Sequence, residues 1–530
     1  MANFQRIQKC KEILQQGIIA PLVMLSSRKA VLNVLRGGRR FVLTAETKFA
    51  NPNIEMTTMA NGLRVVTDST PGHFSALGCY VDAGSKYEDP QNPGLAHIWD
   101  RLAWKSTEKY SGLEMMENLS KLGGNYMCSA QRESMIYQAS VFNNDVDRMF
   151  DVIAQTIRSP RTTDQELLEA LQTADYEVGE IAHKHDVLLP EVLHAAAYNN
   201  NTLGLPLFCP QERIPDITKD DVLNFHSKFY QPQNVVMAMV GVSHEHALSL
   251  AKLQFGDWKG SLSKPTVDTI KYTGGEISLP YQPPLYDNLP ELYHMQIGFE
   301  TAGLLDDDLY ALATLQKLLG GGSSFSAGGP GKGMFSRLYT RVLNQYAFVE
   351  NCMAFNHAYV DSGLFGITIS CSPNAAHVMS QIICFELSKL LEKDPEKGGL
   401  TASEVQRAKN QLKSSLLMNI ESKLAKLEDL GRQIQCQGKL TTVDEMVTKI
   451  ENLTVEQIRS VAEKILTGNV VTKGISSGKP TTIMQGNRAA FGDVEYIIRH
   501  FGLGKYSDPP IPAPRDFSEE PKSKRFGKWF

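Results

Sequence analysis

The feature that most constrains this chain is a long internal repeat. Three signals that mark a helix start or a strand occur twice in the same order. Thr163 and Thr401 are each followed three residues later by Glu, a pattern that caps the first backbone N–H groups of a helix. The repeated helix starts are Thr163 with Thr401 (separation 238) and Thr218 with Thr454 (236). The third signal is a β-branched segment, expected to form a strand, that begins at Asn234 and again at Asn469 (235).

This nearly constant separation predicts two copies of one α+β fold. A chain of 530 residues is too long for a single hydrophobic core of ordinary size. The period is also far too long for a solenoid of short repeats. We therefore predict two homologous domains that arose by internal duplication and are joined by a linker. The predicted ranges are 54–263 for the first domain, 264–284 for the linker and 285–502 for the second domain.

The second copy is predicted to carry an added loop. Ala83 and Ala302, near the starts of the two copies, are 219 residues apart, whereas the later helix starts are 238 apart. The growth of 19 residues must therefore lie between Ala302 and Thr401. We assign these extra residues to a glycine-rich segment at 320–333.

The first 45 residues are strongly basic. They hold eight Lys or Arg residues against one acid, Glu12, so the rest of the chain carries a formal charge of −11. Basic residues among apolar ones at helical spacing are typical of a mitochondrial transit peptide. We predict one at 1–45, with a surface helix or a disordered tail as alternatives. The Pro-rich, charged stretch 503–530 is predicted to be an extended tail.

Several other kinds of site are disfavoured. The eight cysteines are scattered and include no CxxC pair, which argues against a disulfide framework or a structural zinc site. No run of about 18 apolar residues suggests a membrane span. The sequence has no GxSxG motif of a serine hydrolase and no complete phosphate-binding loop. Nucleic acid is not an expected partner.

A degenerate metal motif lies in the first copy. The residues His97, Asp100 and Arg101 stand where an HxxEH helix would supply two zinc ligands and a general base. Arg101 has no lone pair to offer a cation, and Asp100 is one methylene shorter than glutamate. A third ligand would fall at Glu177 or Glu180. We therefore predict no zinc site, and we expect His97 to be a packed helix histidine.

The glycine-rich segment is the second candidate site. It should lie between a helix at 307–319 and another that begins near Met334. A flexible spacer is the plain alternative, but Phe325, Pro330 and Lys332 are unusual in a spacer, and long loops inside compact domains are often functional. The residues of the segment are Gly320, Gly321, Gly322, Ser323, Ser324, Phe325, Ser326, Ala327, Gly328, Gly329, Pro330, Gly331, Lys332 and Gly333.

Taken together, these motifs resemble one peptidase family. The stretch that begins GGGSSFSAGGPGKGM, with the degenerate HxxEH, is similar to the alpha subunits of mitochondrial processing peptidases, which are non-catalytic members of the M16 (pitrilysin-like) metallopeptidase family. The resemblance extends from about Asn61 to Gly502. It implies two M16-type domains, substrate binding by residues 320–333, and no catalytic residue and no cofactor in this chain.

The resemblance also implies partners and a location. The expected partners are a beta subunit, which would hold the zinc, and the cationic presequences of precursor proteins. The expected location is the mitochondrial matrix, and peripheral association with the inner membrane stays open. The alternative is a structural core subunit of the ubiquinol-cytochrome c reductase complex, which the GGPGKGM stretch disfavours. A self-sufficient metallopeptidase is disfavoured by Arg101.

Overall fold

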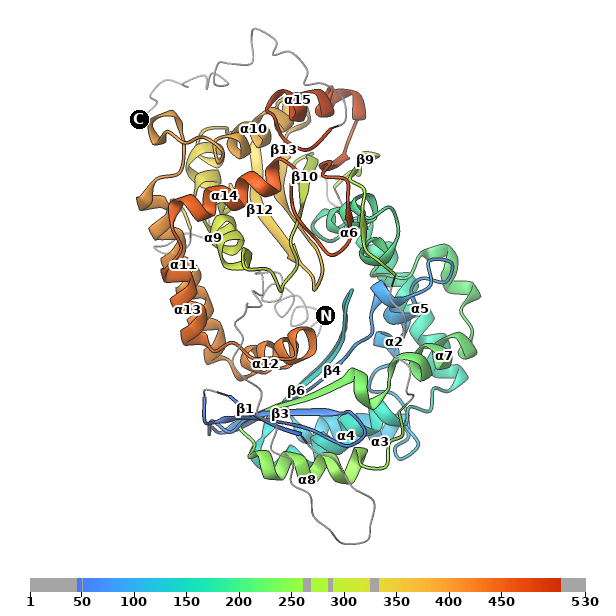
Figure 1. Cartoon of the computed structure of the whole chain (residues 1–530). Helices are drawn as coiled ribbons and strands as arrows, with labels where there is room; N and C mark the ends of the chain where they lie inside the picture. Colours follow the sequence, from blue (N-terminus) through green and yellow to red (C-terminus); the bar gives the residue numbers. More distant parts are fainter. Residues whose placement is uncertain (1–44, 50, 261–267, 285–288, 325–332, 507–530) are drawn as a thin grey trace.

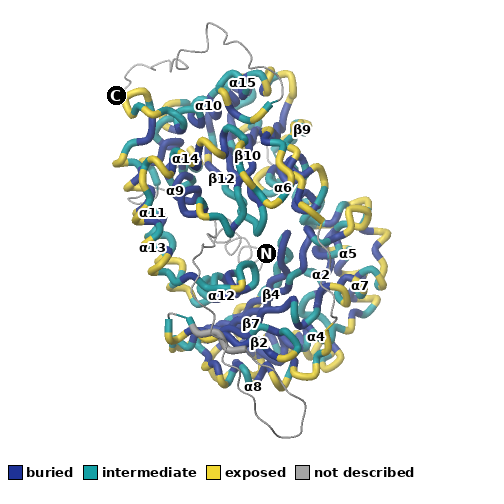
Figure 2. Tube along the Cα trace, in the orientation of Figure 1, coloured by how far each residue is buried: buried dark blue, intermediate teal, exposed yellow. Residues whose placement is uncertain are grey.

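The computed structural model describes residues 45–49, 51–260, 268–284, 289–324 and 333–506. Each half of the chain forms a mixed β-sheet with helices packed on it (Figure 1). Burial follows the strands and the helix faces that contact them (Figure 2). Within the described ranges, no helix combines the length and the apolar character needed to cross a membrane.

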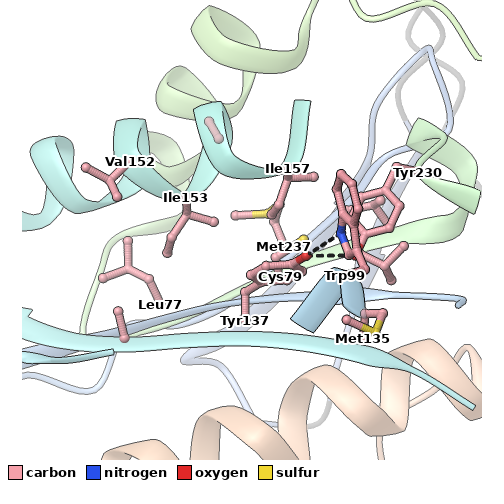
Figure 3. Packing of buried hydrophobic residues seen from close by; sticks show 14 of the residues in the cluster. Leu77, Cys79, Trp99, Met135, Tyr137, Val152, Ile153, Ile157, Tyr230 and Met237 are labelled. Carbon is pink, nitrogen blue, oxygen red and sulfur yellow. Dashed lines mark hydrogen bonds between the residues drawn. The ribbon is translucent and has the colours of Figure 1, made fainter. Parts of the chain in front are cut away.

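The first half is built on a seven-stranded sheet. In order across the sheet the strands are β1 (Ala45–Lys48), β2 (Ile54–Thr58), β3 (Arg64–Asp68), β7 (Val235–Val240), β4 (Phe74–Val81), β6 (Met135–Phe142) and β5 (Asn125–Ala130). The helices are α2 (Leu95–Leu102), α3 (Gly112–Leu122), α4 (Val146–Arg158), α5 (Asp164–Ile181), α6 (His185–Ala197), α7 (Lys219–Phe229) and α8 (His244–Phe255). One core lies between this sheet and α2, α4, α7 and α8, and Figure 3 shows its centre.

The second half is built on a six-stranded sheet. In order across the sheet the strands are β11 (Gly321–Ser323), β12 (Val349–Ala358), β13 (Gly363–Cys371), β10 (Tyr293–Thr301), β15 (Thr481–Gln485) and β9 (Gly275–Leu279). β8 (Lys271–Tyr272) and β14 (Ile475–Ser476) form a separate parallel pair. The helices are α9 (Leu309–Leu319), α10 (Ala376–Ser388), α11 (Ala402–Glu421), α12 (Lys423–Gln437), α13 (Val443–Glu451), α14 (Val455–Leu466) and α15 (Val494–His500). The core lies between this sheet and α9, α10 and α14.

The two sheets repeat the same topology. Five strands run in the order β3-β7-β4-β6-β5 in the first half and β9-β15-β10-β13-β12 in the second. In both, the first pair is parallel and the following pairs are antiparallel. The predicted capping boxes at Thr163 and Thr401 begin α5 and α11, and those at Thr218 and Thr454 begin α7 and α14. The predicted α+β duplication is therefore confirmed.

The structure differs from the predicted boundaries in three places. β1 begins at Ala45, the last residue of the predicted transit peptide, and lies before the predicted start of the first domain at residue 54. The range 264–284, predicted as a linker, contains β8 and β9, and β9 pairs with β15 as part of the second sheet. No side chain of β9 is fully buried, so no apolar run marks it in the sequence. Leu503, in the predicted tail, is fully buried in the second core. Residues 1–44 of the predicted transit peptide and 507–530 of the predicted tail lie outside the described residues.

The second strand of the repeated signal was placed wrongly. The predicted strand that begins at Asn469 is paired only at Ile475 and Ser476, and Val471 within it is 87% exposed. The true counterpart of β7 is β15, whose five residues are all buried. The apolar residues of the segment from Asn469 therefore belong to a surface loop. Only burial distinguishes this segment from β15.

The extra residues of the second copy are divided between two places. Val146 and Ala376, the first residues of α4 and α10, are 230 positions apart, and Asp164 and Ala402, the first residues of α5 and α11, are 238 apart. Eight of the 19 extra residues therefore lie after α10, in the segment 389–401, and only the remainder lies before it. The assignment of all of them to the glycine-rich segment was wrong.

The two halves exchange one helix each. α12 belongs to the second copy, yet its buried residues Leu427, Leu430 and Ile434 pack on the first sheet, against side chains such as Tyr80 and Val236. Figure 1 shows α12 lying over β4 between the two sheets. Polar contacts fix the helix at both ends: Lys426 Nζ lies 2.5 Å from Asp68 Oδ2, and Arg64 Nη1 donates to the carbonyl of Ile434 at 2.9 Å.

The reciprocal helix is α6, which belongs to the first copy. Its residues Leu189 and Leu193 pack on the second sheet against Phe355, Leu364 and Ile483. α6 follows α5 just as α12 follows α11, so the exchanged helices occupy equivalent positions in the two copies. Because each sheet needs a helix from the other copy to bury its second apolar face, the halves fold as one unit.

Two strand turns meet between the halves. The turn between β5 and β6 carries Glu133, which accepts the ammonium of Lys86 at 2.7 Å and the backbone N–H of Val360 at 2.9 Å. Val360 and Asp361 lie in the turn between β12 and β13, and Lys86 also contacts Asp361 at 3.4 Å. The equivalent turns of the two copies are thus joined by the hydrogen bond from Val360 to Glu133 and by Lys86, which contacts one acid from each turn.

The exchange predicts that a substitution in the second copy destabilises the first sheet. Leu430→Ala removes a side chain that is only 3% exposed, and the cavity should cost about 3 kcal/mol of unfolding free energy. Amide hydrogen exchange should then accelerate in β4 and β7. Leu417→Ala, at an α11 position that is 45% exposed, is the control and should change stability by less than about 0.5 kcal/mol. Faster exchange in α12 alone would contradict the packing.

The ion pair of Lys426 and Asp68 predicts a pH dependence. Burial by itself raises the pKa of Asp68, but Lys426 and Thr70 outweigh it and lower that pKa. The stabilisation is therefore complete above the ordinary aspartate pKa of about 3.9 and is lost as the pH falls through the lowered value. Lys426→Met should cost about 2 kcal/mol at pH 7 and less below pH 4, measured by urea unfolding. A cost independent of pH would rule out the ion pair as its source.

Candidate functional site

The degenerate metal motif lies on α2, whose start is fixed by Glu88. The two carboxylate oxygens of Glu88 accept the backbone N–H groups of Gly94 and Ala96, each at 2.6 Å. These are among the free N–H groups of the first turn of a helix, which a capping carboxylate satisfies. Burial raises the pKa of Glu88 to about 8, despite these two hydrogen bonds. Glu88 therefore holds the N-terminus of α2 in a fixed place.

The opposite face of α2 is locked into the first core. Trp99 Nε1 donates to the hydroxyl of Tyr137 at 3.0 Å, and that hydroxyl lies 2.7 Å from the hydroxyl of Tyr230 (Figure 3). Trp99 is 3% exposed, and Ile98 beside it is fully buried. Because residues 98 and 99 face the core, the helical repeat turns His97, Asp100 and Arg101 toward α5.

His97 and α5 are joined through Glu177. His97 Nε2 lies 3.1 Å from Glu177 Oε2, and His97 Nδ1 accepts the backbone N–H of Cys209 at 3.2 Å. Since Nδ1 is an acceptor, the ring proton is carried by Nε2 and points at Glu177. His97 is 2% exposed. Of the two distal glutamates proposed from the sequence, Glu177 joins this cluster, whereas Glu180 pairs with Lys184 at 3.5 Å.

Arg101 fills the space between the acids of the cluster. Its Nη1 lies 3.0 Å from Glu177 Oε1, and its Nη2 lies 2.7 Å from Asp100 Oδ2. Burial alone would lower the pKa of Arg101, but Asp100 and Glu177 outweigh burial and raise it. The guanidinium thus supplies the positive charge that a metal would bring.

The cluster therefore does not fit a zinc ion. Both nitrogens of His97 are engaged, and Arg101 has no lone pair. In the described part of the chain, no group of three or more His, Cys, Asp or Glu side chains is arranged to hold a metal. What the arrangement can do is tie α2 to α5 by a permanent cation.

The described part of the glycine-rich segment begins as an edge strand. β11 pairs antiparallel with β12, and the backbone N–H of Ala354 donates to the carbonyl of Gly320 at 2.9 Å. The N–H of Ser324 donates to the carbonyl of Glu350 at 2.7 Å. The first five residues of the segment are therefore fixed on the second sheet. The residues Phe325, Ser326, Ala327, Gly328, Gly329, Pro330, Gly331 and Lys332 lie outside the described residues.

Two positions in this strand require glycine. Gly320 and Gly321 have φ angles of +57° and +93°, which side chains disfavour. A Cβ on Gly321 would lie 2.0 Å from the carbonyl oxygen of Cys352, and one on Gly320 would lie 2.4 Å from Cβ of Ser336. The glycines thus allow the strand to approach β12 and the returning chain closely.

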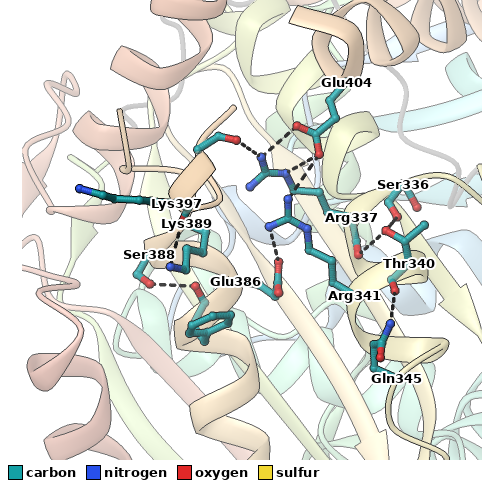
Figure 4. Close-up of polar contacts among 12 residues, drawn as sticks. Ser336, Arg337, Thr340, Arg341, Gln345, Glu386, Ser388, Lys389, Lys397 and Glu404 are labelled. Atoms are coloured by element: carbon teal, nitrogen blue, oxygen red, sulfur yellow. Dashed lines mark hydrogen bonds and ion pairs between the residues drawn. The ribbon is translucent and has the colours of Figure 1, made fainter. Parts of the chain in front are cut away.

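The residues that follow the glycine-rich segment, Ser336 and Arg337, are also anchored. Ser336 Oγ accepts the N–H of Gly321 at 3.1 Å, which joins the two ends of the segment. Arg337 is 2% exposed and contacts Glu404 of α11 at 3.0 Å. It also donates to the carbonyl of Gly399 at 2.7 Å, in the second stretch of extra residues (Figure 4). The predicted helix near Met334 begins instead at about Arg337 and continues as a π-helix over Tyr339–Leu343.

The sequence indicated the two candidate segments but not the residues that hold them in place. Glu88, Ser336 and Arg337 carry no motif, because a cap or a clamp depends on which backbone groups come near in space. The β-pairing of Gly321–Ser323 was also missed, since glycine is depleted in strands. The one available signal was the charge of Arg337 close after the apolar residues Met334 and Phe335, which could have suggested a buried arginine with an acidic partner.

Comparisons with known proteins match this architecture. A family profile described as Insulinase (Peptidase family M16) matches residues 64–211, and one described as Peptidase M16 inactive domain matches residues 216–412. A mitochondrial-processing peptidase subunit alpha from Neurospora crassa is 42% identical, with 91% of this chain and 94% of the relative covered. A probable subunit of the same name from Schizosaccharomyces pombe is 45% identical over 84% of this chain and 88% of the relative. The human subunit alpha is 35% identical over 78% and 80%.

The geometry around Arg101 predicts that a metal site can be restored. Asp100→Glu combined with Arg101→His recreates HxxEH beside Glu177, and we expect one zinc ion per chain with Kd below about 1 µM, measured by titration and metal analysis. Arg101→Met alone should bind no zinc and should lose about 2 kcal/mol of stability, because two carboxylates are left without their cation. Zinc bound by the wild-type cluster with the same affinity would refute the role given to Arg101.

Proposed function

The chain belongs to the M16 peptidase family, among the alpha subunits of mitochondrial processing peptidases, and we propose that it is the presequence-binding, non-catalytic subunit of such a peptidase. The observation that carries this proposal is the guanidinium of Arg101 between Asp100 and Glu177. A filled metal position cannot activate water, so the zinc and the peptide cleavage would come from a beta subunit.

The glycine-rich segment is the proposed substrate-binding element. Both of its ends are anchored: β11 pairs with β12 of the second sheet, Ser336 binds the N–H of Gly321, and Arg337 binds Glu404 of α11. Glycine-rich backbone offers hydrogen-bonding groups without a bulky side chain, so it can accept many different sequences. Such tolerance suits presequences, which share charge and amphipathic character rather than one sequence. The residues proposed to bind are Gly320, Gly321, Gly322, Ser323, Ser324, Phe325, Ser326, Ala327, Gly328, Gly329, Pro330, Gly331, Lys332 and Gly333.

Charge and location agree with this proposal. Residues 46–530 carry a formal charge of −11, which attracts cationic peptides over a distance of about 10 Å. The relatives are named as mitochondrial proteins. We propose the mitochondrial matrix as the location, with residues 1–45 as the transit peptide. The alternative of a structural core subunit is not favoured, because the similar proteins named above are processing peptidase subunits.

The test is cleavage of a precursor with a cationic presequence. The isolated chain should be inactive, and activity should appear on mixing with an HxxEH-bearing M16 subunit. Replacing residues 325–332 with Gly-Ser-Gly keeps β11 and its bond to Ser336, so the complex should still form while kcat/KM falls by about 10-fold or more.

The matched control replaces the exposed turn Pro395–Lys397, in the second stretch of extra residues, with three glycines. It should leave kcat/KM unchanged. Cleavage by the isolated chain would refute the non-catalytic assignment. Full activity of the shortened segment, with the complex intact, would instead support a structural role for this chain.

A further inference from the structure

A small pocket lies in the second half between α9, α14 and the chain that follows α14. Figure 1 shows α9 and α14 side by side. The pocket has a volume of about 140 Å³, and its apolar lining includes Leu309, Leu312, Val461 and Ile465. Val471 also lines it and is 87% exposed, so the pocket is open to solvent. An apolar cavity of this size can hold one aromatic ring. We call it the α9–α14 pocket.

The equivalent space in the first copy is filled by an aromatic side chain. Tyr87 and Asp306 occupy equivalent positions, because each donates its backbone N–H to the carbonyl of a glycine three residues earlier. The acceptors are Gly84, at 3.1 Å, and Gly303, at 3.0 Å. The ring of Tyr87 packs against that of Phe229 on α7, with 6.1 Å between their centroids. Asp306, which has no ring, lines the α9–α14 pocket instead.

The helix residues that face this space also lost their rings in the second copy. α7 and α14 are equivalent helices, and each begins after a threonine cap, so their positions can be compared by distance from the cap. Phe225 and Phe229, whose ring centroids lie 5.0 Å apart, then correspond to Val461 and Ile465. Both of these smaller residues line the pocket. The pocket is therefore the space that aromatic rings occupy in the first copy.

Aspartates give one side of the pocket a negative charge. Asp306 and Asp308 line it, and Asp307 between them is exposed. Lys464, the one basic residue of the lining, lies with its Nζ 2.6 Å from Asp308 Oδ2. Asp306 has no ion pair with another described residue, and its Oδ1 accepts the backbone N–H of Asp308 at 2.9 Å. The charge of Asp306 is thus left for a cationic group.

The described chain ends beside this pocket. The N–H of Gly504 donates to the carbonyl of Leu466 at 2.7 Å, and Leu466 directly follows Ile465 of the lining. The last nine residues of the sequence, KSKRFGKWF at 522–530, hold four basic and three aromatic residues and no acid. They begin 16 residues after Tyr506, and an extended chain covers about 3.3 Å per residue, so they can reach the pocket. A segment tethered in this way has an effective concentration in the millimolar range.

We propose that the basic segment 522–530 of this chain docks on the α9–α14 pocket, with the ring of Phe526 inside it. The segment lies outside the described residues, and its chemistry is what fits. Phe526 has three basic residues within two positions, which would lie beside Asp306, whereas Phe530 has one. The indole of Trp529 is larger than a single ring of benzene size. Phe526 would thus complete the second copy as Tyr87 completes the first.

The first experiment detects the contact directly in the full chain. Phe526→p-benzoylphenylalanine places a photoreactive ring in the segment, and irradiation should crosslink it to α9 or α14, identified by mass spectrometry of the digested protein. The control places the same group at Phe517, which stands beside Asp516 and shortly before Glu519. The pocket should repel these acids, so the control should not crosslink to α9 or α14.

The second experiment fills the pocket with the residues of the first copy. Val461→Phe combined with Ile465→Phe should exclude Phe526. Trypsin should then cleave after Arg525 about 10-fold faster than in the wild type, because cleavage of a docked segment follows the fraction that is released. Asp306→Asn keeps an acceptor for the N–H of Asp308 but removes the charge, so it should speed cleavage less and reduce its dependence on salt.

Two further variants serve as controls. Phe526→Ser lies outside the described fold and should speed cleavage as much as the filled pocket does. Leu253→Phe adds a ring at a position of α8 that is 74% exposed, and it should leave the cleavage rate unchanged. Circular dichroism establishes that each variant is folded.

The outcomes decide the proposal without reference to the proposed function. Crosslinks to α9 or α14 that disappear when the pocket is filled would support it. Crosslinks to other elements, or the same cleavage rate in the wild type and the filled variant, would overturn it. Crosslinks only between chains would also overturn it and make a second copy the occupant. Precursor cleavage enters none of these measurements, so the proposed function is tested separately.

Discussion

The exchange of α6 and α12 is the constraint on which the rest of this structure depends. A sheet with two apolar faces must be covered on both sides, and each half supplies helices for only one. The second face is covered by a helix of the other copy, with Leu427 and Leu430 on the first sheet and Leu189 and Leu193 on the second. Neither half therefore has a complete core alone, and the relative position of the sheets is set by packing.

The exchange also explains why the two copies could diverge at their sites without losing the fold. α2 carries its site residues on the face turned toward α5, away from the exchanged helices. There, Arg101 could replace a metal ligand as long as Asp100 and Glu177 kept a cation between them. In the second copy, β12 is an outer strand, and the extra residues could join its edge as β11 without disturbing α6. Both changes, Arg101 on α2 and β11 at the edge of β12, lie outside the contacts that α6 and α12 make with the sheets.

The sequence predicted those parts of the fold that depend on local signals. The capping boxes at Thr163 and Thr401 each depend on residues only three positions apart, so the sequence shows them directly. Their separation predicted the duplication correctly. Tertiary pairing left no such signal. The segment from Asn469 has strand-like residues but lies largely on the surface, whereas Thr481–Gln485 forms β15, an inner strand between β10 and β9 whose residues are all buried. The helix exchange was missed for the same reason, since an amphipathic stripe does not say which sheet it will meet.

The two sites differ in how they treat charge, and that difference suits a division of labour. At α2, a permanent guanidinium is paired with two carboxylates, so the cluster has no free ligand to offer and can only stabilise the fold. At the glycine-rich segment, the described residues 320–324 are held by neutral groups, through the pairing of β11 with β12 and the hydrogen bond from Gly321 to Ser336. One site is therefore closed by fixed charge, whereas residues 320–324 carry no charged side chain and are positioned by their backbone.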